Sequence, residues 1–228
     1  MPKPKKPPLR KTTAGPGGRL NHRTVVGQRR RARTEARIIE AALHVFAEKG
    51  LRGAVIDDFI KAAGIARGTF YNYFPSIGEL LLATRKWLND DLVQSIEDSI
   101  SDIDDPITRF GVGIRLWMRR AASDRAWCGF VSQLRLFGTP ALEKPLRDIK
   151  RALRARQIDV PSMDAAMDLV QGAKTYAMYR MLTEPRGADH GNNIAILILQ
   201  GLGVNRKTIA EIMRRPLPEF RRQPMTIR

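Results

Sequence analysis

Apolar residues recur at the spacing of an α-helix along most of this 228-residue sequence. Between Arg33 and Lys49 they occupy positions 38, 39, 42, 43 and 46, which line one face of a helix, and Gly50 supplies a stop signal. No segment shows the alternation of a half-buried strand, and neither an internal repeat nor a heptad pattern competes with the helical period. The pattern therefore predicts an all-α fold.

Capping signals set the boundaries of the remaining predicted helices. Ser76 precedes Glu79 by three residues, which is a capping box, and predicts a helix that runs towards Ile100. Pro106 suits the first turn of the next helix, because the N–H that proline lacks would have no partner there. Further helices are predicted over 123–137, from Thr139-Pro140 onward, over 162–182 and 192–202, and from Asn205 to Pro216.

Two short predicted helices form a motif of their own. They span 56–63 and 67–74 and flank a turn in which Gly64 permits a left-handed backbone. Two short helices across such a turn form a helix-turn-helix, whose second helix lies in the major groove of DNA. Phe70 and Phe74 are four residues apart and should face inward, which leaves a polar face outward.

The segment from Ala54 to Ser76, AVIDDFIKAAGIARGTFYNYFPS, closely resembles the DNA-binding segment of the tetracycline-repressor family. The resemblance covers about Arg33 to Leu82, and its core is the run GTFYNYF at 68–74. It implies a homodimer with an N-terminal three-helix helix-turn-helix domain and a C-terminal helical domain for ligand binding and dimerisation. By this resemblance the chain is a sequence-specific transcription regulator, a repressor that a small molecule releases from a palindromic double-stranded DNA operator.

The outward face of the second short helix carries side chains suited to reading bases. An arginine such as Arg67 can grip guanine, an asparagine such as Asn72 can pair with adenine, and Thr69 offers a methyl group to thymine. The resemblance implies that Tyr71 and Tyr73 place their hydroxyls on phosphates, with helix packing as the alternative role. The predicted DNA-binding positions here are Val55, Ala66, Arg67, Gly68, Thr69, Tyr71, Asn72 and Tyr73.

Three positions depart from the family pattern. Val55 stands where many members have a capping Thr, Ala66 where a Ser is frequent, and Ile77 where a phosphate-contacting Lys is usual. The motif therefore lacks groups that can touch phosphate. We expect another part of the chain to supply that affinity.

The positive charge of the chain is concentrated at its N-terminus. The formal net charge is +17, and residues 1–33 hold eleven Lys or Arg and no acidic residue. Prolines at 2, 4, 7 and 8 and the glycine-rich run 15–18 predict a disordered basic arm over 1–30. Arg31 and Arg33 lead from it into the first helix, and such a segment binds phosphates by releasing counterions. A solvated solubility tail and a transit peptide are the alternatives.

The C-terminal half is rich in aromatic and methionine residues. These could line an apolar pocket between helices, although ordinary core packing is the alternative for each of them. The predicted ligand-binding residues are Trp117, Met118, Trp127, Phe130, Phe137, Tyr176 and Tyr179. The resemblance places a dimer interface on the helices at 162–182 and 192–202, with Ala166, Val170, Ala173, Ala177, Leu197 and Ile198 as candidates.

The sequence also argues against several kinds of site and segment. Cys128 is the single cysteine and there are three histidines, so neither a disulfide, a metal site nor a cofactor is expected. No phosphate loop or nucleophile elbow is present, which argues against an enzyme. Without a readable membrane span or secretory signal, we expect a cytoplasmic protein, associated with the nucleoid when bound.

The expected domains are a basic arm over 1–30, the helix-turn-helix over 31–78, the ligand-binding and dimerisation domain over 79–216 and a tail over 217–228. One rival function stays open at this point. The basic arm and the sparsely equipped motif could cover DNA with little sequence preference and without a ligand, as a nucleoid-like or partner-controlled protein does.

Overall fold

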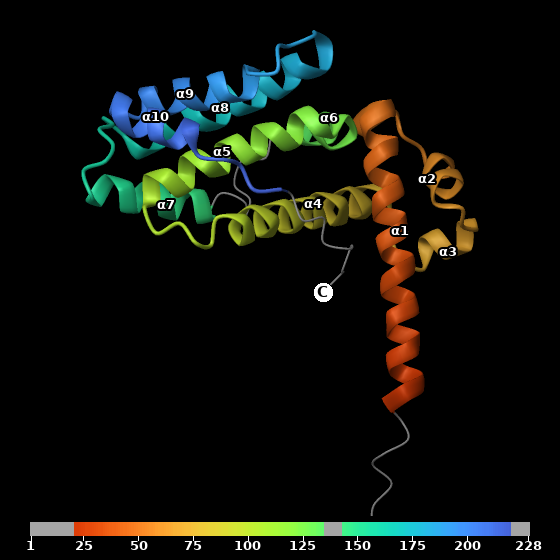
Figure 1. Cartoon of the computed structure of the whole chain (residues 1–228). Coiled ribbons are helices and arrows are strands. Elements are labelled where there is room, and N and C mark those ends of the chain that lie inside the picture. Colours follow the sequence, from red (N-terminus) through yellow and green to blue (C-terminus); the bar gives the residue numbers. More distant parts are fainter. Residues whose placement is uncertain (1–20, 135–142, 220–228) are drawn as a thin grey trace, which may run out of the picture.

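The computed structural model describes residues 21–134 and 143–219, and these residues form helices and connecting segments without a strand (Figure 1). The prediction of an all-α fold is confirmed. The helices are α1 (Asn21–Gly53), α2 (Ile56–Ala63), α3 (Arg67–Tyr71), α4 (Ile77–Ser99), α5 (Pro106–Ser123), α6 (Arg125–Leu134), α7 (Glu143–Arg154), α8 (Met163–Thr183), α9 (His190–Gly201) and α10 (Arg206–Arg214).

Helices α1, α2 and α3 form a small unit, with α2 and α3 on the same side of α1 (Figure 1). Phenylalanine rings make its core: the centroids of Phe46 and Phe59 are 5.0 Å apart, and those of Phe59 and Phe70 are 6.4 Å apart. Gly64 turns the chain between α2 and α3 with φ 59° and ψ 47°, a conformation that glycine adopts without steric cost. The predicted helix-turn-helix is thus present.

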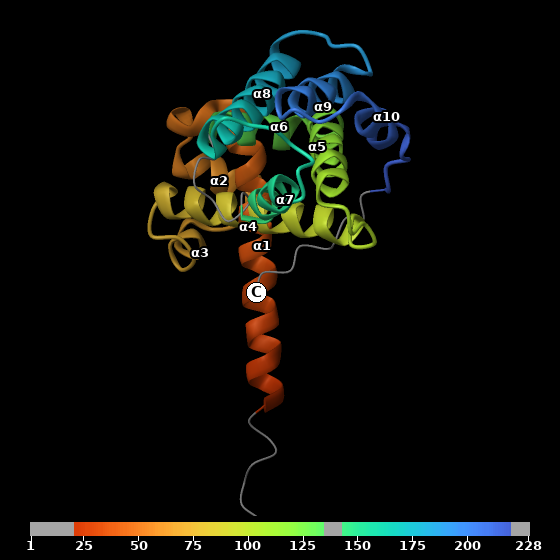
Figure 2. The ribbon, with the colours of Figure 1, turned by 90° about the vertical axis from the view of Figure 1, so that its left-hand side faces the viewer.

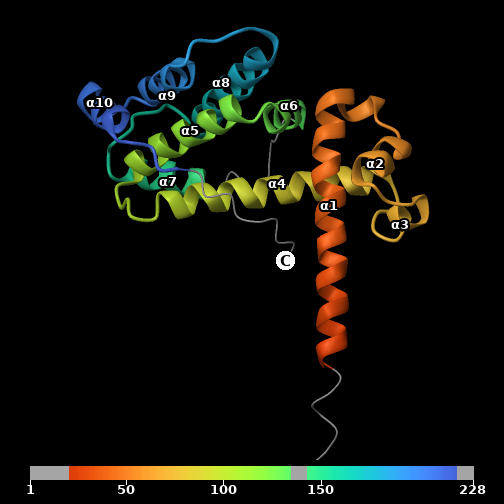
Figure 3. The same ribbon diagram turned by 45° about the vertical axis from the view of Figure 1, so that its right-hand side comes forward.

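Helix α1 begins at Asn21 rather than at Arg33, so the prediction of a disordered arm up to residue 30 is wrong for residues 21–30. Arginine, glutamine and alanine, which are frequent between 28 and 36, favour helix, and the buried part of α1 further along supplies the nucleus from which the helix extends. The N-terminal turns of α1 project away from the rest of the molecule (Figures 1 and 3). Residues 1–20 lie outside the described ranges.

Helix α3 ends at Tyr71 rather than at Phe74 as predicted. A turn follows, in which the N–H groups of Tyr73 and Phe74 both donate to the carbonyl oxygen of Phe70, at 3.0 and 2.9 Å, and Pro75 then disfavours helical backbone at Phe74. Gly50, predicted to stop the first helix, has non-helical φ 75° and ψ 168°, and one more turn follows it up to Gly53.

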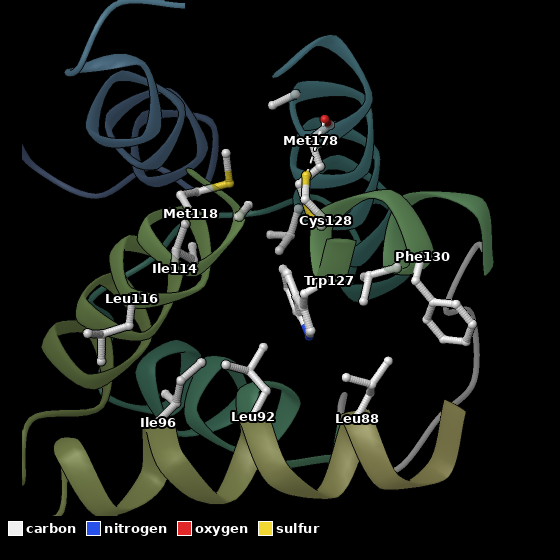
Figure 4. Close-up of a cluster of buried hydrophobic side chains, with 14 of the residues drawn as sticks. Leu88, Leu92, Ile96, Ile114, Leu116, Met118, Trp127, Cys128, Phe130 and Met178 are labelled. Atoms are coloured by element: carbon white, nitrogen blue, oxygen red, sulfur yellow. Dashed lines mark hydrogen bonds between the residues drawn. The ribbon is translucent and has the colours of Figure 1, made fainter. Parts of the chain in front are cut away.

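Helix α4 leads from the N-terminal unit into a larger helical domain with three layers (Figure 2). Helices α8 and α9 form the outer layer, α5 and α6 lie in the middle, and α4 and α7 close the opposite side (Figures 1 and 2). Helix α5 packs against α4 and against every helix from α6 to α10. Side chains from α4, α5, α6 and α8 meet around the buried Trp127 (Figure 4).

Polar caps begin four of the helices where the sequence predicted them. The side chains of Ser76, Asp105, Ser162 and Asn205 accept hydrogen bonds from the backbone N–H three residues later, at 3.2, 2.9, 3.3 and 2.9 Å. The predicted helix end at Phe137 and the predicted cap at Thr139-Pro140 lie outside the described residues, which resume at Glu143 in α7.

The C-terminal segment is held on α5 by two arginines. Arg115 donates hydrogen bonds to the carbonyl oxygens of Ile212 and Arg215, at 2.6 and 2.7 Å. Arg119 donates to the carbonyl oxygens of Leu217, at 3.4 Å, and of Pro218. The first residues of the predicted tail are therefore anchored to the domain.

Within residues 21–134 and 143–219, no helix combines the length and the apolarity that crossing a membrane would require. In the same ranges, no three His, Cys, Asp or Glu side chains come together as a metal site would need.

Candidate DNA-binding surface and ligand pocket

The segment 66–73, which we call the α3 reading face, presents polar groups outward while its phenylalanines anchor it. Phe70 is fully buried and Phe74 is buried behind it, as predicted from their spacing. On the other side of the helix, Thr69 and Tyr73 are half-buried, and the remaining predicted positions are exposed: Ala66, Arg67, Gly68, Tyr71 and Asn72. The geometry leaves this face free to approach a duplex.

Two exposed side chains of the reading face have partners in α2 and α3. Arg67 forms an ion pair and hydrogen bond with Asp57 of α2, and both side chains are exposed to solvent. The ring of Tyr71 stands edge-on against Phe70, with centroids 5.6 Å apart, while its outer part remains in solvent. Both residues thus keep a defined orientation and an exposed polar end.

The extension of α1 contacts the reading face through Tyr73. The guanidinium carbon of Arg31 lies 5.4 Å from the centroid of the Tyr73 ring, within the range of a cation–π contact. Arg33, two residues further along α1, is exposed, and so are Arg29 and Arg30, which immediately precede Arg31. This α1 arginine cluster, residues 29, 30, 31 and 33, therefore adds positive charge beside the reading face.

Val55, at the start of α2, is exposed and offers no hydroxyl. Instead, the side chain of Asp58 caps the start of α2. Its carboxylate accepts a hydrogen bond from the backbone N–H of Val55 at 3.0 Å and another from Lys49. The hydrogen bond from Lys49 and then that from Val55 hold the pKa of Asp58 below its usual value. Position 55 thus adds an apolar rather than a hydrogen-bonding group to the surface.

A cavity of about 70 Å³ lies in the larger domain, between α4, α5, α6, α7 and α8. We call it the ligand pocket. Apolar side chains make most of its wall, and four charged residues reach it: Glu97, Arg109, Asp148 and Lys174. Ser132, Gln171 and Thr175 add uncharged polar groups.

Arg109 organises one side of the ligand pocket. Its guanidinium pairs with Glu97 at 3.1 Å and with Asp148 at 3.3 Å, and it donates to the carbonyl oxygens of Ile100 and Ile103 at 2.7 and 3.1 Å. Each of its three nitrogens is engaged by these contacts. Asp148 is buried, and its other oxygen, Oδ1, has no hydrogen-bond partner among the described residues.

Lys174 reaches the pocket from α8 and contacts Trp117, which stands eight residues after Arg109 on α5. The side chain is 7% exposed, and its Nζ sits 4.7 Å from the centroid of the Trp117 ring. Burial lowers the pKa of Lys174 from 10.5 to about 8, because the charged ammonium loses its hydration. Among the described residues, no carboxylate forms an ion pair with it.

The predicted ligand-binding residues divide into those near the pocket and those elsewhere. Trp117 lines it. Trp127 stands behind Trp117, with centroids 5.2 Å apart, and Met118 lines a separate hollow beside Arg115. Both belong to the core (Figure 4). Phe137 lies outside the described residues.

Three of these predictions are corrected by the structure. Phe130 is fully buried and packs on Phe46 of α1, with centroids 5.7 Å apart, so it joins the two domains rather than lining the pocket. Tyr176 and Tyr179 are 62% and 53% exposed and stack on each other at 6.3 Å. They occupy the outer face of α8, because a helix that buries one face in a domain must turn the other away.

Four of the six dimer candidates are corrected as well. Ala166, Val170, Ala177 and Ile198 are buried within the protomer and cannot form a surface, whereas Ala173 is half-buried. Leu197 is 61% exposed, and Leu169, Tyr176 and Tyr179 are exposed with it. We call these four the α8–α9 apolar face.

Two family models match the chain. The model described as bacterial regulatory proteins of the tetR family matches residues 38–84, and the model described as tetracyclin repressor-like C-terminal domain matches residues 105–215. Together the two matches span more than two thirds of the chain.

Named relatives match this chain over very different lengths. The HTH-type transcriptional regulator CymR of Pseudomonas putida is 44% identical over 61 residues, which are 27% of this chain and 30% of CymR. The uncharacterized regulator YvdT of Bacillus subtilis is 51% identical over 47 residues, 21% of this chain and 24% of YvdT, so the chain matches less than a third of either protein. The HTH-type transcriptional repressor DhaR of Mycobacterium sp. (strain GP1) is 28% identical over 192 residues, 83% of this chain and 90% of DhaR.

Solved structures match over most of the chain. RolR in complex with resorcinol superposes with a TM-score of 0.62 at 27% identity, over 85% of this chain and all of RolR. FadR of Bacillus subtilis in complex with stearoyl-CoA superposes with a TM-score of 0.62 at 18% identity, over 72% of this chain and 97% of FadR, which is a likeness of fold alone.

Proposed function

The chain belongs to the TetR family of bacterial regulatory proteins, and we propose that it is a homodimeric, sequence-specific transcriptional repressor that leaves its operator when a small molecule fills the ligand pocket. The observation that carries the proposal is the presence, in one protomer, of an exposed polar reading face on α3 and a cavity between α4 and α8. A role on DNA implies that the protein works in the cytoplasm, at the nucleoid when bound.

In this proposal the reading face enters the major groove. Arg67, Thr69 and Asn72 contact base edges, whereas Tyr71 and Tyr73 contact phosphates. Because Val55 and Ala66 bring no hydroxyl, the α1 arginine cluster supplies phosphate contacts in their place.

Two copies of the reading face are needed, since one short helix makes few contacts. A two-fold dimer presents two recognition helices about one duplex turn apart, roughly 34 to 36 Å, and so reads a palindrome. We place the dimer interface on the α8–α9 apolar face, because large apolar side chains exposed together on a protomer mark a surface that another protein covers.

Two helices join the ligand pocket to the DNA-binding unit. Helix α4 begins directly after the reading face and lines the pocket through Val93, Ile96, Glu97 and Ile100. In α6, Phe130 packs on Phe46 of α1, while the next residue, Val131, lines the pocket. A ligand that favours one position of these helices shifts the spacing of the two reading faces by its differential affinity for the two states.

Both the pocket and one relative indicate a small ligand. RolR, which superposes on most of this chain, binds resorcinol, a single-ring compound. The cavity of about 70 Å³ also suits a small molecule better than a long acyl chain.

Affinity for selected DNA tests the proposal. Fragments bound by the full chain are first recovered from genomic DNA, and binding to the enriched sequence is then measured by fluorescence anisotropy against random duplex. We expect Arg67→Ala and Thr69→Ala each to weaken operator binding about fivefold or more, since a good base contact contributes roughly 1 to 3 kcal/mol. Lys207→Ala, which removes an exposed charge on α10, is the matched control and should bind as the wild type does.

A second candidate function is ligand-independent DNA binding of low specificity, and the exposed α1 arginine cluster is the observation that favours it. The same titration separates the two. If random duplex displaces the protein from the enriched sequence as well as that sequence itself does, the repressor proposal fails and the low-specificity function replaces it.

A further inference from the structure

Among the side chains that the structure describes, one buried cation of the ligand pocket, Lys174, has no carboxylate partner. Lys174 is 7% exposed, and its one recorded partner among the described residues is the face of the Trp117 ring, 4.7 Å away. A buried ammonium is costly unless an anion pairs with it. A cation–π contact offsets part of that cost and leaves the remaining N–H donors free.

The two acids of the pocket are already engaged with arginines. Glu97 pairs with Arg109 at 3.1 Å and with Arg147 at 3.5 Å. Asp148 pairs with Arg109 at 3.3 Å and lies 3.9 Å from both Arg147 and Arg151. Arginines thus neutralise both acids, and among the described residues Lys174 is the charged group of the pocket lining without an ion pair.

The rest of the wall sets the shape of an occupant. Phe110, Ile114 and Trp117 are apolar or aromatic, and they follow Arg109 along α5. The cavity of about 70 Å³ is smaller than the roughly 150 Å³ in which an engineered apolar cavity holds benzene, so it admits a single ring only with a small outward adjustment of its walls.

We infer that the effector is a small single-ring organic anion, of the benzoate type, whose carboxylate pairs with Lys174 and whose ring packs on Trp117. The inference rests on the proposed function for its regulatory meaning, and it names the ligand class of that same pocket. A carboxylate replaces the lost hydration of the ammonium with a charge-assisted hydrogen bond, which makes binding selective for the charged ligand.

Calorimetric titration of the full-length protein with benzoate and with benzamide tests the charge requirement directly. The two probes share ring and size and differ in charge. We expect benzoate to bind at least tenfold more tightly than benzamide at neutral pH, and salicylate and cyclohexanecarboxylate to exceed their amides in the same way. If no acid of this panel binds better than its amide, or if neutral resorcinol binds better than every acid, the inference is overturned.

Substitutions at position 174 test the residue. Lys174→Met keeps the length of the side chain and removes the charge, so it should lose the preference for benzoate while its affinity for benzamide changes less than about threefold. Lys174→Arg should keep the preference, and Lys207→Met, at an exposed position on α10, is the control. A Lys174→Met protein that keeps the wild-type preference overturns the assignment, and the wild-type comparison of acid with amide stands even if a variant does not fold.

The same preparations separate this inference from the proposed function. Operator affinity is measured alongside each titration. Specific DNA binding with no preference for acids overturns the ligand class alone. A preference for acids in a protein that fails to discriminate operator from random duplex overturns the repressor proposal alone.

Discussion

Arg109 and Lys174 are both buried cations in one pocket, and the chemistry of their head groups gives them different roles. The planar guanidinium of Arg109 spreads its donors over two carboxylates and two carbonyl oxygens, which ties α4, α5 and α7 together. The ammonium of Lys174 is a compact charge on a flexible stem, and among the described residues it meets an aromatic ring and no acid. Arg109 is therefore structural, whereas Lys174 is available to a ligand.

The burial of Lys174 predicts a specific dependence of stability on pH. Its pKa in the folded protein, about 8, is below the unfolded value of 10.5, so its contribution is destabilising below pH 8, where both states are protonated. Between pH 8 and 10.5 the unfolded state binds more protons, and stability rises with pH. We expect Lys174→Met to have a larger free energy of unfolding than the wild type below pH 8. This difference should shrink across the window by about 3 kcal/mol, at 1.36 kcal/mol per pKa unit.

Urea unfolding of the two proteins at several pH values measures that difference. Glu97 on α4, Arg109 on α5 and Asp148 on α7 line the same cavity and are identical in both proteins, so the difference isolates Lys174. Cys128, whose pKa burial raises to about 11, is also common to both. A constant difference between pH 7 and pH 11 would show that the ammonium is solvated in the folded state.

The spacing of residues along α8 pointed to the burial of Lys174, whereas a search for aromatic and methionine residues passes over it. Position 174 continues the buried stripe of α8 formed by Ala166, Val170 and Met178, at intervals of four residues. A lysine in such a stripe is ambiguous from sequence, because its long stem often carries the charge back to solvent. Only the packing of α5 against α8 decides that this one remains inside.

At the scale of the helices, two glycines share a backbone conformation but differ in their surroundings. Gly64 has φ 59° and Gly203 has φ 75°, in the left-handed region that disfavours any residue with a Cβ by about 1 to 2 kcal/mol. A methyl group at position 64 would meet no atom within 4 Å. At position 203 it would lie 2.8 Å from the backbone oxygen of Asp159.

We therefore expect Gly64→Ala to lower the free energy of unfolding by about 1 to 2 kcal/mol and Gly203→Ala to lower it by clearly more. The extra loss at 203 comes from moving the Asp159 backbone, whose N–H donates to the carbonyl of Leu202 at 3.0 Å. Urea titration followed by circular dichroism measures both. If both variants lose the same free energy of unfolding, the backbone around Asp159 moves aside at no measurable cost.

Helix starts that carry a polar cap were predictable from sequence, whereas the start of α1 and several helix ends were not, for a physical reason. A cap such as Ser76 or Asn205 satisfies a backbone N–H within three residues, so its signal is local. The start of α1 at Asn21 has no such cap in the described residues, and the helix continues outward from a part that is held by packing. The pocket, likewise, is assembled from five helices, and the sequence indicated its material but not which side chains converge.

At the scale of the whole molecule, the DNA-binding unit and the outermost helices lie on different parts of the protomer, and α6, which forms the middle layer with α5, packs against both α1 and α8 (Figure 1). The α8–α9 apolar face points away from this middle layer, since its four side chains are exposed on the protomer. A dimer built there places both reading faces far from the interface, so their separation is sensitive to small movements of the helices between.

The dimer is the premise on which palindrome reading depends, and one substitution tests it. Leu197→Glu puts a charge in the centre of the α8–α9 apolar face, where burial against a partner would leave it desolvated and unpaired. Light scattering should then report the 25.7 kDa protomer in place of twice that mass, and operator affinity should fall at least about a hundredfold because each half-site is bound alone. Leu153→Glu, at an exposed leucine on α7, should remain dimeric and bind DNA normally. A dimeric Leu197→Glu protein would place the interface elsewhere and leave Leu169, Tyr176 and Tyr179 as a surface for a different partner.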